Sequence, residues 1–106
     1  MQVQGANLYV QYCVGCHQSS GRGLPGIFPP LAGNGAVVAE NPGNILKVVL
    51  LGVSAANGRV PMPSFGAQMT NEEIAIVANY VRTSWGNAAE ANATAGVIAA
   101  LRPHAK

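Results

Sequence analysis

Both cysteines of the chain lie within five consecutive residues, Cys13-Val14-Gly15-Cys16-His17. This C-x-x-C-H spacing is the attachment signature of c-type haem. Each thiol can add to one vinyl group of the porphyrin, and the histidine that follows then lies under the iron, where its imidazole can bind the metal. The motif therefore predicts one covalent haem c, attached through Cys13 and Cys16, with His17 as an iron ligand.

Two other uses of a C-x-x-C pair have weaker support in the sequence. A thioredoxin-like redox dithiol needs a βαβ pattern, and no segment shows a convincing period-two alternation. A structural zinc site usually has four ligands. The chain has no second cysteine pair, and its only other histidine is His104 in the C-terminal tail. Haem attachment is the interpretation that the motif favours.

A second iron ligand is expected from a methionine, because a thioether opposite histidine favours the reduced iron and suits electron transfer. Met62 lies between Pro61 and Pro63, whose restricted backbone angles predict a stiff, extended loop. Met69 directly precedes a helix cap at Thr70, where it can instead pack on the helix as a hydrophobic staple. The sequence therefore favours Met62 as the second ligand and leaves Met69 as the alternative.

Hydrophobic periodicity predicts an all-α chain with long irregular connections. A first helix is expected over residues 3–13. A short one is expected over 42–51, with Asn41 as its N-cap and Gly52 at its end. The candidate buried positions of the first helix are Val3, Leu8, Tyr9 and Tyr12, and the apolar body of the second consists of Ile45, Val48, Val49 and Leu51.

The clearest predicted helix begins after Thr70. Thr70 and Glu73 form a capping box, worth roughly 1 kcal/mol at the cap, and Gly86 provides a stop. Residues 18–43 and 53–69 are rich in turn-forming residues and are expected to be mostly loop. The positions that recur at helical spacing in the last helix are Ile74, Val77, Ala78 and Val81.

The length of 106 residues predicts one domain. We expect residues 1–86 to form the haem domain, and residues 87–106 to form an Ala-rich extension with one further helix, ending near Leu101, packed on that domain. The chain has only two Phe, three Tyr and one Trp. Such a chain offers a thin core for its size, and a large apolar prosthetic group would complete it.

The distribution of charged residues along the sequence argues against two classes of binding partner, nucleic acids and membrane surfaces. The six Lys and Arg and the four Asp and Glu are scattered along the chain, which argues against a nucleic-acid-binding stripe or a basic membrane-binding helix. No stretch has the length needed to cross a bilayer, so no membrane span is expected. No signal peptide is visible at the N-terminus either.

From Gly5 to Gly86 the chain resembles class I cytochromes c. The N-terminal helix of that family has a Gly and an aromatic residue four apart ahead of C-x-x-C-H, as Gly5 and Tyr9 are here. Its C-terminal helix has an aliphatic and an aromatic residue three apart, as Val77 and Tyr80 are. The resemblance implies a class I cytochrome c fold: three or more helices, with long loops, around one covalent haem.

The resemblance also implies roles for loop residues. The segment from Pro29 to Gly33 matches the P-x-L-x-G pattern of the family, in which the carbonyl of Pro29 would accept a hydrogen bond from Nδ1 of His17. The Met-Pro-x-Phe segment at Met62 matches the axial-methionine loop of the family. These matches add Pro29 to the expected haem-binding residues and favour Met62 independently of loop rigidity.

Two side chains keep two interpretations each. Arg59 lies three residues before Met62, and could either bond a haem propionate or remain a solvated loop residue. Trp85 could direct its indole N–H at a propionate or pack at a helix end. The sequence does not decide between these roles.

Residues 28–34 and 78–87 are similar to cytochrome subunits of bacterial membrane-associated dehydrogenases. That similarity implies a single-electron carrier, or an electron-transfer domain of a larger oxidoreductase, and not an enzyme. Electrons would pass from a periplasmic or membrane dehydrogenase to an acceptor such as a terminal oxidase or reductase. Haem attachment of this kind implies export, so we expect the periplasm or the periplasmic face of the inner membrane, with the signal peptide removed.

An alternative function is a haem enzyme or gas sensor with an open iron position. Such a protein needs an iron without a methionine ligand, and a distal pocket of polar donors. The sequence instead offers Met62 and few polar residues that are candidates for burial. A purely structural interaction module is a third class, against which the haem motif argues.

Overall fold

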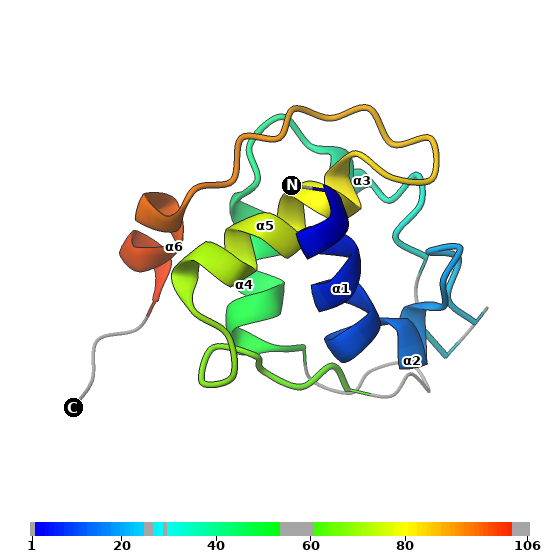
Figure 1. Cartoon of the computed structure of the whole chain (residues 1–106), viewed down its shortest axis with the longest axis horizontal. Coiled ribbons are helices and arrows are strands. Elements are labelled where there is room, and N and C mark those ends of the chain that lie inside the picture. Colours follow the sequence, from blue (N-terminus) through cyan, green and yellow to red (C-terminus); the bar gives the residue numbers. More distant parts are fainter. Residues whose placement is uncertain (1, 25–26, 29, 54–60, 103–106) are drawn as a thin grey trace.

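A computed structural model describes residues 2–24, 27–28, 30–53 and 61–102 of the chain. In these residues the secondary structure is helical apart from two isolated bridges, so the predicted all-α class is confirmed. The helices are shown in Figure 1. They are α1 (Gln2–Tyr12), α2 (Val14–His17), α3 (Gly35–Val38), α4 (Gly43–Leu51), α5 (Asn71–Arg82) and α6 (Ala95–Leu101).

The crossing of α1 and α5 is the most extensive contact between helices, and Gly5 makes it possible. A Cβ atom placed on Gly5 would lie 2.7 Å from Cβ of Tyr80, which is closer than two carbon atoms can pack. The rings of Tyr9 and Tyr80 lie 5.8 Å apart at the same crossing. The expected close approach of the two helices at Gly5 is therefore present.

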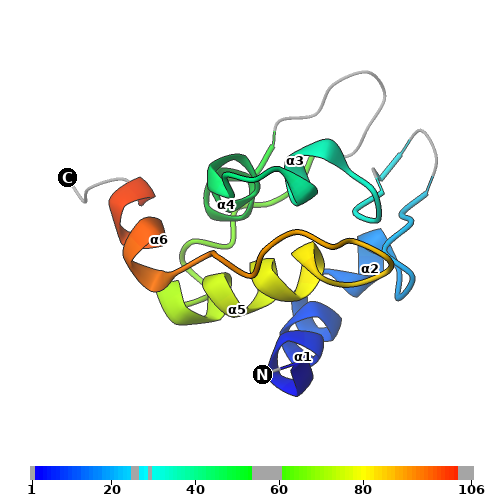
Figure 2. The same ribbon diagram turned by 90° about the horizontal axis from the view of Figure 1, so that it is seen from above.

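Helix α5 lies between α1 and α4, as the view from above in Figure 2 shows. The buried face of α4 consists of Ile45, Leu46, Val49 and Leu50. Leu51, one of the apolar positions of the predicted helix, is 53% exposed because the helix turns it away from this face. The predicted burial of Val3 is wrong: it lies in the first turn of α1 and is 74% exposed.

The start of α4 differs by one residue from the prediction. Pro42 is the N-cap, and Gly43 is the first helical residue. The side chain of Asn41 still satisfies the helix end, since its Oδ1 accepts a hydrogen bond of 2.8 Å from the amide of Gly43. The helix ends at Gly52 as expected, with a φ of 77° that suits glycine.

The capping box of α5 is present as predicted. Thr70 accepts a hydrogen bond from the amide of Glu73 at 3.1 Å, and Glu73 accepts one from the amide of Thr70 at 2.9 Å. The helix ends at Arg82, before the expected stop at Gly86. The hydroxyls of Thr83 and Ser84 donate to carbonyls of the last turn, which satisfies groups that a longer helix would have bonded through its backbone.

The segment that follows α5 runs back along that helix (Figures 1 and 2). Asn79 fastens it through a reciprocal pair of hydrogen bonds with the backbone of Ala93, each 3.0 Å long. The next helix, α6, begins at an N-cap formed by Thr94. Its Ile98 is fully buried, and the helix contacts α4 and α5. This segment therefore packs on the rest of the chain.

Like the short helix α2, helix α3 is an element that the sequence did not indicate. It lies in the stretch expected to be mostly loop. Asn34 caps it by accepting hydrogen bonds from the amides of Ala36 and Val37, at 2.9 and 3.4 Å. Four residues are too few to show a helical period in the sequence. The helix is recognised only in the structure, where its Val37 is buried in the core.

Candidate functional site

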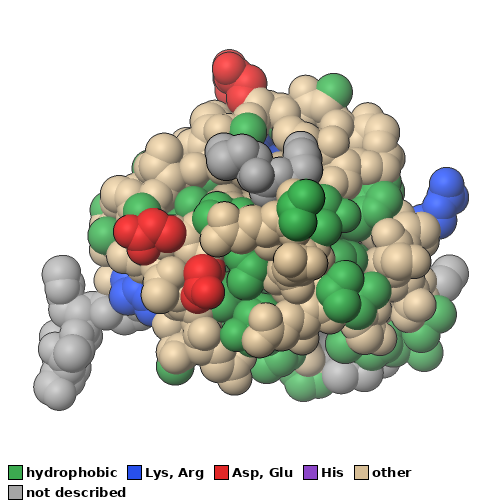
Figure 3. All heavy atoms as spheres, in the orientation of Figure 1, with side chains coloured by type: hydrophobic (Ala, Val, Ile, Leu, Met, Phe, Trp, Pro, Cys, Tyr) green, Lys and Arg blue, Asp and Glu red, His purple; other side chains and the backbone are tan. Residues whose placement is uncertain are grey.

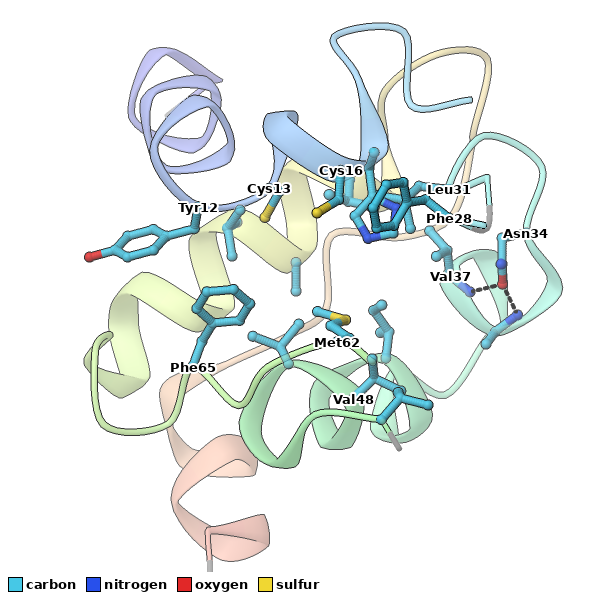
Figure 4. A pocket seen from close by; sticks show the side chains of 18 of the residues that line it. Tyr12, Cys13, Cys16, Phe28, Leu31, Asn34, Val37, Val48, Met62 and Phe65 are labelled. Atoms are coloured by element: carbon cyan, nitrogen blue, oxygen red, sulfur yellow. Dashed lines mark hydrogen bonds between the residues drawn. The ribbon is translucent and has the colours of Figure 1, made fainter. Parts of the chain in front are cut away.

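A cavity of about 430 Å³ lies between α2, α4, α5 and the loop that carries Met62. Figure 4 shows its lining. Most of the lining is aliphatic or aromatic, with Val49 from α4, Val77 and Val81 from α5, and Leu31 from the loop before α3. A space of this volume and apolar character is typical of a binding site for a small organic group.

The short helix α2 brings three chemically distinctive side chains to one wall of the cavity. Its single turn is closed by hydrogen bonds from the amide of His17 to the carbonyl of Cys13, 3.0 Å, and from the amide of Gln18 to the carbonyl of Val14, 2.9 Å. Residues three and four apart share one face of a helix, so Cys13, Cys16 and His17 all line the cavity. The sulfur atoms of both cysteines point into it in Figure 4.

Met62 lies on the opposite wall. In Figure 4 its side chain enters the cavity from the side facing Cys13 and Cys16. Its backbone is held by an antiparallel bridge to Val53, with two hydrogen bonds of 2.9 and 3.0 Å. A Cβ on Gly52 would lie 2.5 Å from the carbonyl oxygen of Met62, so only glycine allows this close approach. The backbone at Met62 is therefore held by contacts beyond the effect of its two flanking prolines.

Met69, the alternative ligand, lies elsewhere. It is 4% exposed, belongs to the hydrophobic core together with Ile74, and is not part of the cavity lining. That placement matches the staple position directly before a helix cap. Of the two methionines that the sequence left open, the fold brings only Met62 to the cavity.

Burial governs the ionisation of groups beside the cavity. It raises the pKa of the Cys13 thiol to about 11, with a smaller contribution from the neighbouring Cys16. Burial also raises the pKa of Tyr9 far above its ordinary value, and its hydroxyl donates to the carbonyl of Gln18 at 2.6 Å. A redox-active dithiol needs a lowered cysteine pKa. The direction at Cys13 is the opposite, which argues against the thioredoxin-like interpretation.

Asn87 supports the loop that forms one end of the cavity. Its amide nitrogen donates to the carbonyls of Leu31 and Val81, at 3.1 and 2.9 Å. Its Oδ1 accepts a hydrogen bond of 2.7 Å from the amide of Gly33. Sequence reasoning missed this role, because an asparagine just after a helix is ordinarily a turn residue, and two of its three partners, Gly33 and Leu31, lie more than fifty positions away.

The remaining predicted positions divide into two groups. Pro29 and Arg59 lie outside the described residues, so their expected roles stay predictions. Trp85 packs at the end of α5: its ring lies 5.1 Å from that of Tyr9, and its Nε1–H donates to the carbonyl of Ser19 at 2.9 Å. The packing interpretation of Trp85 is the one that the fold supports.

The residues present fit a haem. The lining is apolar and the volume is sufficient for a large part of a flat ring system to be enclosed. The C-x-x-C-H side chains lie on one wall and a thioether on the other, which are the donor types that hold and ligate c-type haem. Tyr12 and Phe65 close a third side through ring contact at 5.7 Å.

Comparison with known proteins places the chain in a family. Residues 2–81 match the family model described as cytochrome C oxidase, cbb3-type, subunit III. A cytochrome c-552 of Thermus thermophilus is 41% identical over 96 residues, which cover 82% of this chain and 72% of the relative. The arrangement of the helices also agrees with that of a solved c-type cytochrome. The crystal structure of the c-type cytochrome XoxG from Methylobacterium extorquens AM1 matches 88% of this chain and 55% of its own, with a TM-score of 0.63 and 18% identity.

Other relatives are subunits of larger enzymes. The cytochrome c subunit of alcohol dehydrogenase (quinone) from Gluconacetobacter polyoxogenes is 41% identical over 105 residues, or 94% of this chain. The gluconate 2-dehydrogenase cytochrome c subunit of Pantoea cypripedii is 36% identical over 104 residues, or 92% of this chain. The chain spans 22% and 24% of the length of these two subunits.

The family match covers the C-x-x-C-H motif, the segment around Met62 and α5 up to Val81. Membership in this family implies covalently bound haem c and a role in electron transport. Within the described residues, no helix has both the length and the hydrophobicity to cross a bilayer. The chain thus belongs to the cytochrome c family and has the class I fold.

Proposed function

We propose that the chain transfers single electrons through one haem c whose iron is ligated by His17 and Met62. The observation that carries this proposal is the pair of facing walls in the cavity, with Cys13, Cys16 and His17 on one and Met62 on the other. Haem c, when bound, supplies an iron that alternates between two oxidation states. Two protein ligands leave no position for a substrate, which disfavours the gas sensor or haem enzyme.

The protein would support electron transfer in two ways: by excluding water from the cavity and by holding Met62 in position. Aliphatic walls from α4 and α5 keep water from the cavity, so little solvent has to reorganise when charge changes there. The bridge between Val53 and Met62 holds the backbone that carries the thioether, which lowers the conformational entropy that iron ligation would cost. Both features keep the site the same in the two oxidation states, as rapid electron transfer requires.

Further roles are proposed on the family resemblance. The carbonyl of Pro29 would orient the imidazole of His17, and Arg59 would either pair with a propionate or remain solvated. Residues 1–86 would form the haem domain, with residues 87–106 as an extension. The contacts of α6 with α4 and α5 support a packed extension rather than a free tail.

The donor of electrons is proposed to be a periplasmic or membrane-bound dehydrogenase, and the acceptor a terminal oxidase or reductase. Relatives that are cytochrome c subunits of alcohol and gluconate dehydrogenases support this assignment. The chain would act either as a free carrier or as one domain of such a subunit. Its location would be the periplasm or the periplasmic face of the inner membrane.

The proposal is tested by the haem itself. After denaturation and acid-acetone extraction, the exported protein is expected to have the mass of the polypeptide plus one haem, because two thioethers survive this treatment. A mass equal to that of the bare polypeptide would contradict covalent attachment. The absorption spectrum should also change reversibly on reduction and stay unchanged when carbon monoxide is added. A carbon monoxide adduct of the reduced protein would instead indicate an open iron position.

A second prediction concerns docking to the redox partner. The polypeptide has a formal charge of +2. Two propionates remove about two units and ferric iron returns about one, so the holoprotein is nearly neutral. Among the exposed apolar residues, Val53 lines the cavity, and Leu24 and Ile27 adjoin the lining residue Phe28 through a bridge and along the chain, respectively. On the face shown in Figure 3, acidic and basic side chains are both present and are separated by hydrophobic and uncharged ones.

Partner binding is therefore expected to depend on a small apolar contact and only weakly on salt. The second-order rate of electron transfer with the physiological partner should change less than about threefold between low and physiological ionic strength. A fall of about tenfold over that range would show that charge steers the encounter. Arg22→Gln then identifies whether that exposed arginine, which lies between the haem motif and Leu24, is responsible.

A further inference from the structure

Arg82, the last residue of α5, is fully buried, with an exposed fraction of 0%. Its guanidinium group donates four hydrogen bonds. Nη1 bonds the carbonyls of Val37 and Ala39 at 2.9 and 2.7 Å. Nε bonds the carbonyl of Glu90 at 3.0 Å, and Nη2 bonds Oδ1 of Asn92 at 3.0 Å. An arginine stays charged under all conditions in which a protein folds, so this is a permanent buried cation.

The partners of Arg82 satisfy its hydrogen bonds without neutralising its charge. Three are backbone carbonyls and the fourth is a side-chain amide oxygen, so none carries a formal charge. The chain has four acidic side chains in all, and none of them is buried: Glu40, Glu72, Glu73 and Glu90. Solvent screens an exposed carboxylate, whereas a buried charge is screened much less. The positive charge of Arg82 therefore acts on its buried surroundings.

Those surroundings include the wall of the cavity. Arg82 does not line the cavity itself, but Val37, which accepts one of its hydrogen bonds, and Val81, which precedes it, both do. Ala78, one helical turn before Arg82, lines the cavity as well. The cation thus lies directly behind the lining, next to the apolar residues Val37 and Val81 that line the cavity. It can influence a group in the cavity through its electric field but not by contact.

We propose that Arg82 is a positioning residue of the electron-transfer site that raises the reduction potential of the haem. Oxidation adds one positive charge to the iron, and a nearby cation in a poorly screened environment makes that addition less favourable. The same hydrogen bonds hold the segment that contains Glu90 and Asn92 over the end of α5. The proposal rests on the proposed binding of haem in the cavity.

The chain offers a variant that neutralises Arg82 without removing it. Asn92→Asp places a carboxylate oxygen where Oδ1 now accepts the hydrogen bond from Nη2. It also loses the hydrogen bond of 3.1 Å from Asn92 Nδ2 to the carbonyl of Glu40. Asn92→Ala is the control for that loss, because it adds no charge. Asn44→Asp is the control for charge alone, because Asn44 lies exposed on α4.

The reduction potential of each holoprotein is measured by spectroelectrochemical titration. Arg82→Met is expected to lower the ratio of reduced to oxidised protein at a fixed potential on the order of tenfold, which equals about 59 mV for one electron. Arg82→Lys, which keeps the charge, should stay close to the parent protein. Asn92→Asp should show part of the fall seen for Arg82→Met, while Asn92→Ala and Asn44→Asp should change the ratio less than about twofold.

Two results would overturn the proposal. One is an Asn92→Asp shift no larger than that of Asn44→Asp, which would show that the charge of Arg82 is not felt in the cavity. The other is an equal shift in Arg82→Lys and Arg82→Met, which would indicate a purely structural clamp. If Arg82→Met yields no holoprotein, the Asn92 variants decide alone. A parent protein without covalent haem would refute the proposed function instead, and mass spectrometry separates that outcome.

Discussion

Replacing both Cys13 and Cys16 with Ala is expected to remove the covalent haem and, once haem is extracted, the cooperative fold. The cavity of about 430 Å³ would then have no large group to fill it. At about 24 cal/mol for each Å³ of cavity, the loss amounts to ~10 kcal/mol. That value is comparable with the whole stability of a small domain, about 5–15 kcal/mol. Far-UV circular dichroism during thermal unfolding measures the effect.

The single variants are the matched controls for this prediction. Cys13→Ala and Cys16→Ala each keep one thioether, and each should retain a haem that survives acid-acetone extraction, with a lower melting temperature than the parent protein. The interpretation of the motif would be wrong if the extracted double variant still unfolded cooperatively with the helical content of the parent. In that case the hydrophobic core of the polypeptide would be sufficient to stabilise the fold without haem.

Replacing Met62 with Ala is expected to have the second-largest effect. The variant should lose the weak charge-transfer band of methionine-ligated ferric haem, bind carbon monoxide when reduced, and have a lower reduction potential than the parent. The reason is the position of Met62 on the wall that faces Cys13 and Cys16, on a loop held by Val53. Visible absorption with and without added ligand measures the first two changes.

Met69→Ala is the control for the Met62 variant. Met69 is buried in the core and does not line the cavity. Its replacement should lower the free energy of unfolding by about 2–5 kcal/mol and leave the charge-transfer band unchanged. Loss of the band in Met69→Ala, with retention in Met62→Ala, would reverse the assignment of the ligand.

Local signals in the sequence determined much of this protein. The C-x-x-C-H motif lies within one helical turn, so its spacing alone brings Cys13, Cys16 and His17 to one side of the chain. The capping box at Thr70 and the stop at Gly52 likewise depend on residues at most four positions apart. These features could be predicted because the atoms that interact are close in the chain, and no knowledge of the packing is needed.

Long-range contacts decided the rest. Helix α5 ends at Arg82 rather than near Gly86, and the side chain of Arg82 bonds carbonyls of α3 and of the segment after α5. Asn87 is buried because it joins the loop at Leu31 to the end of α5. Leu51 is exposed although it is apolar. Periodicity ranks positions by hydrophobicity along one helix, whereas burial and polar pairing depend on which other helix covers that face, and only the tertiary structure specifies this.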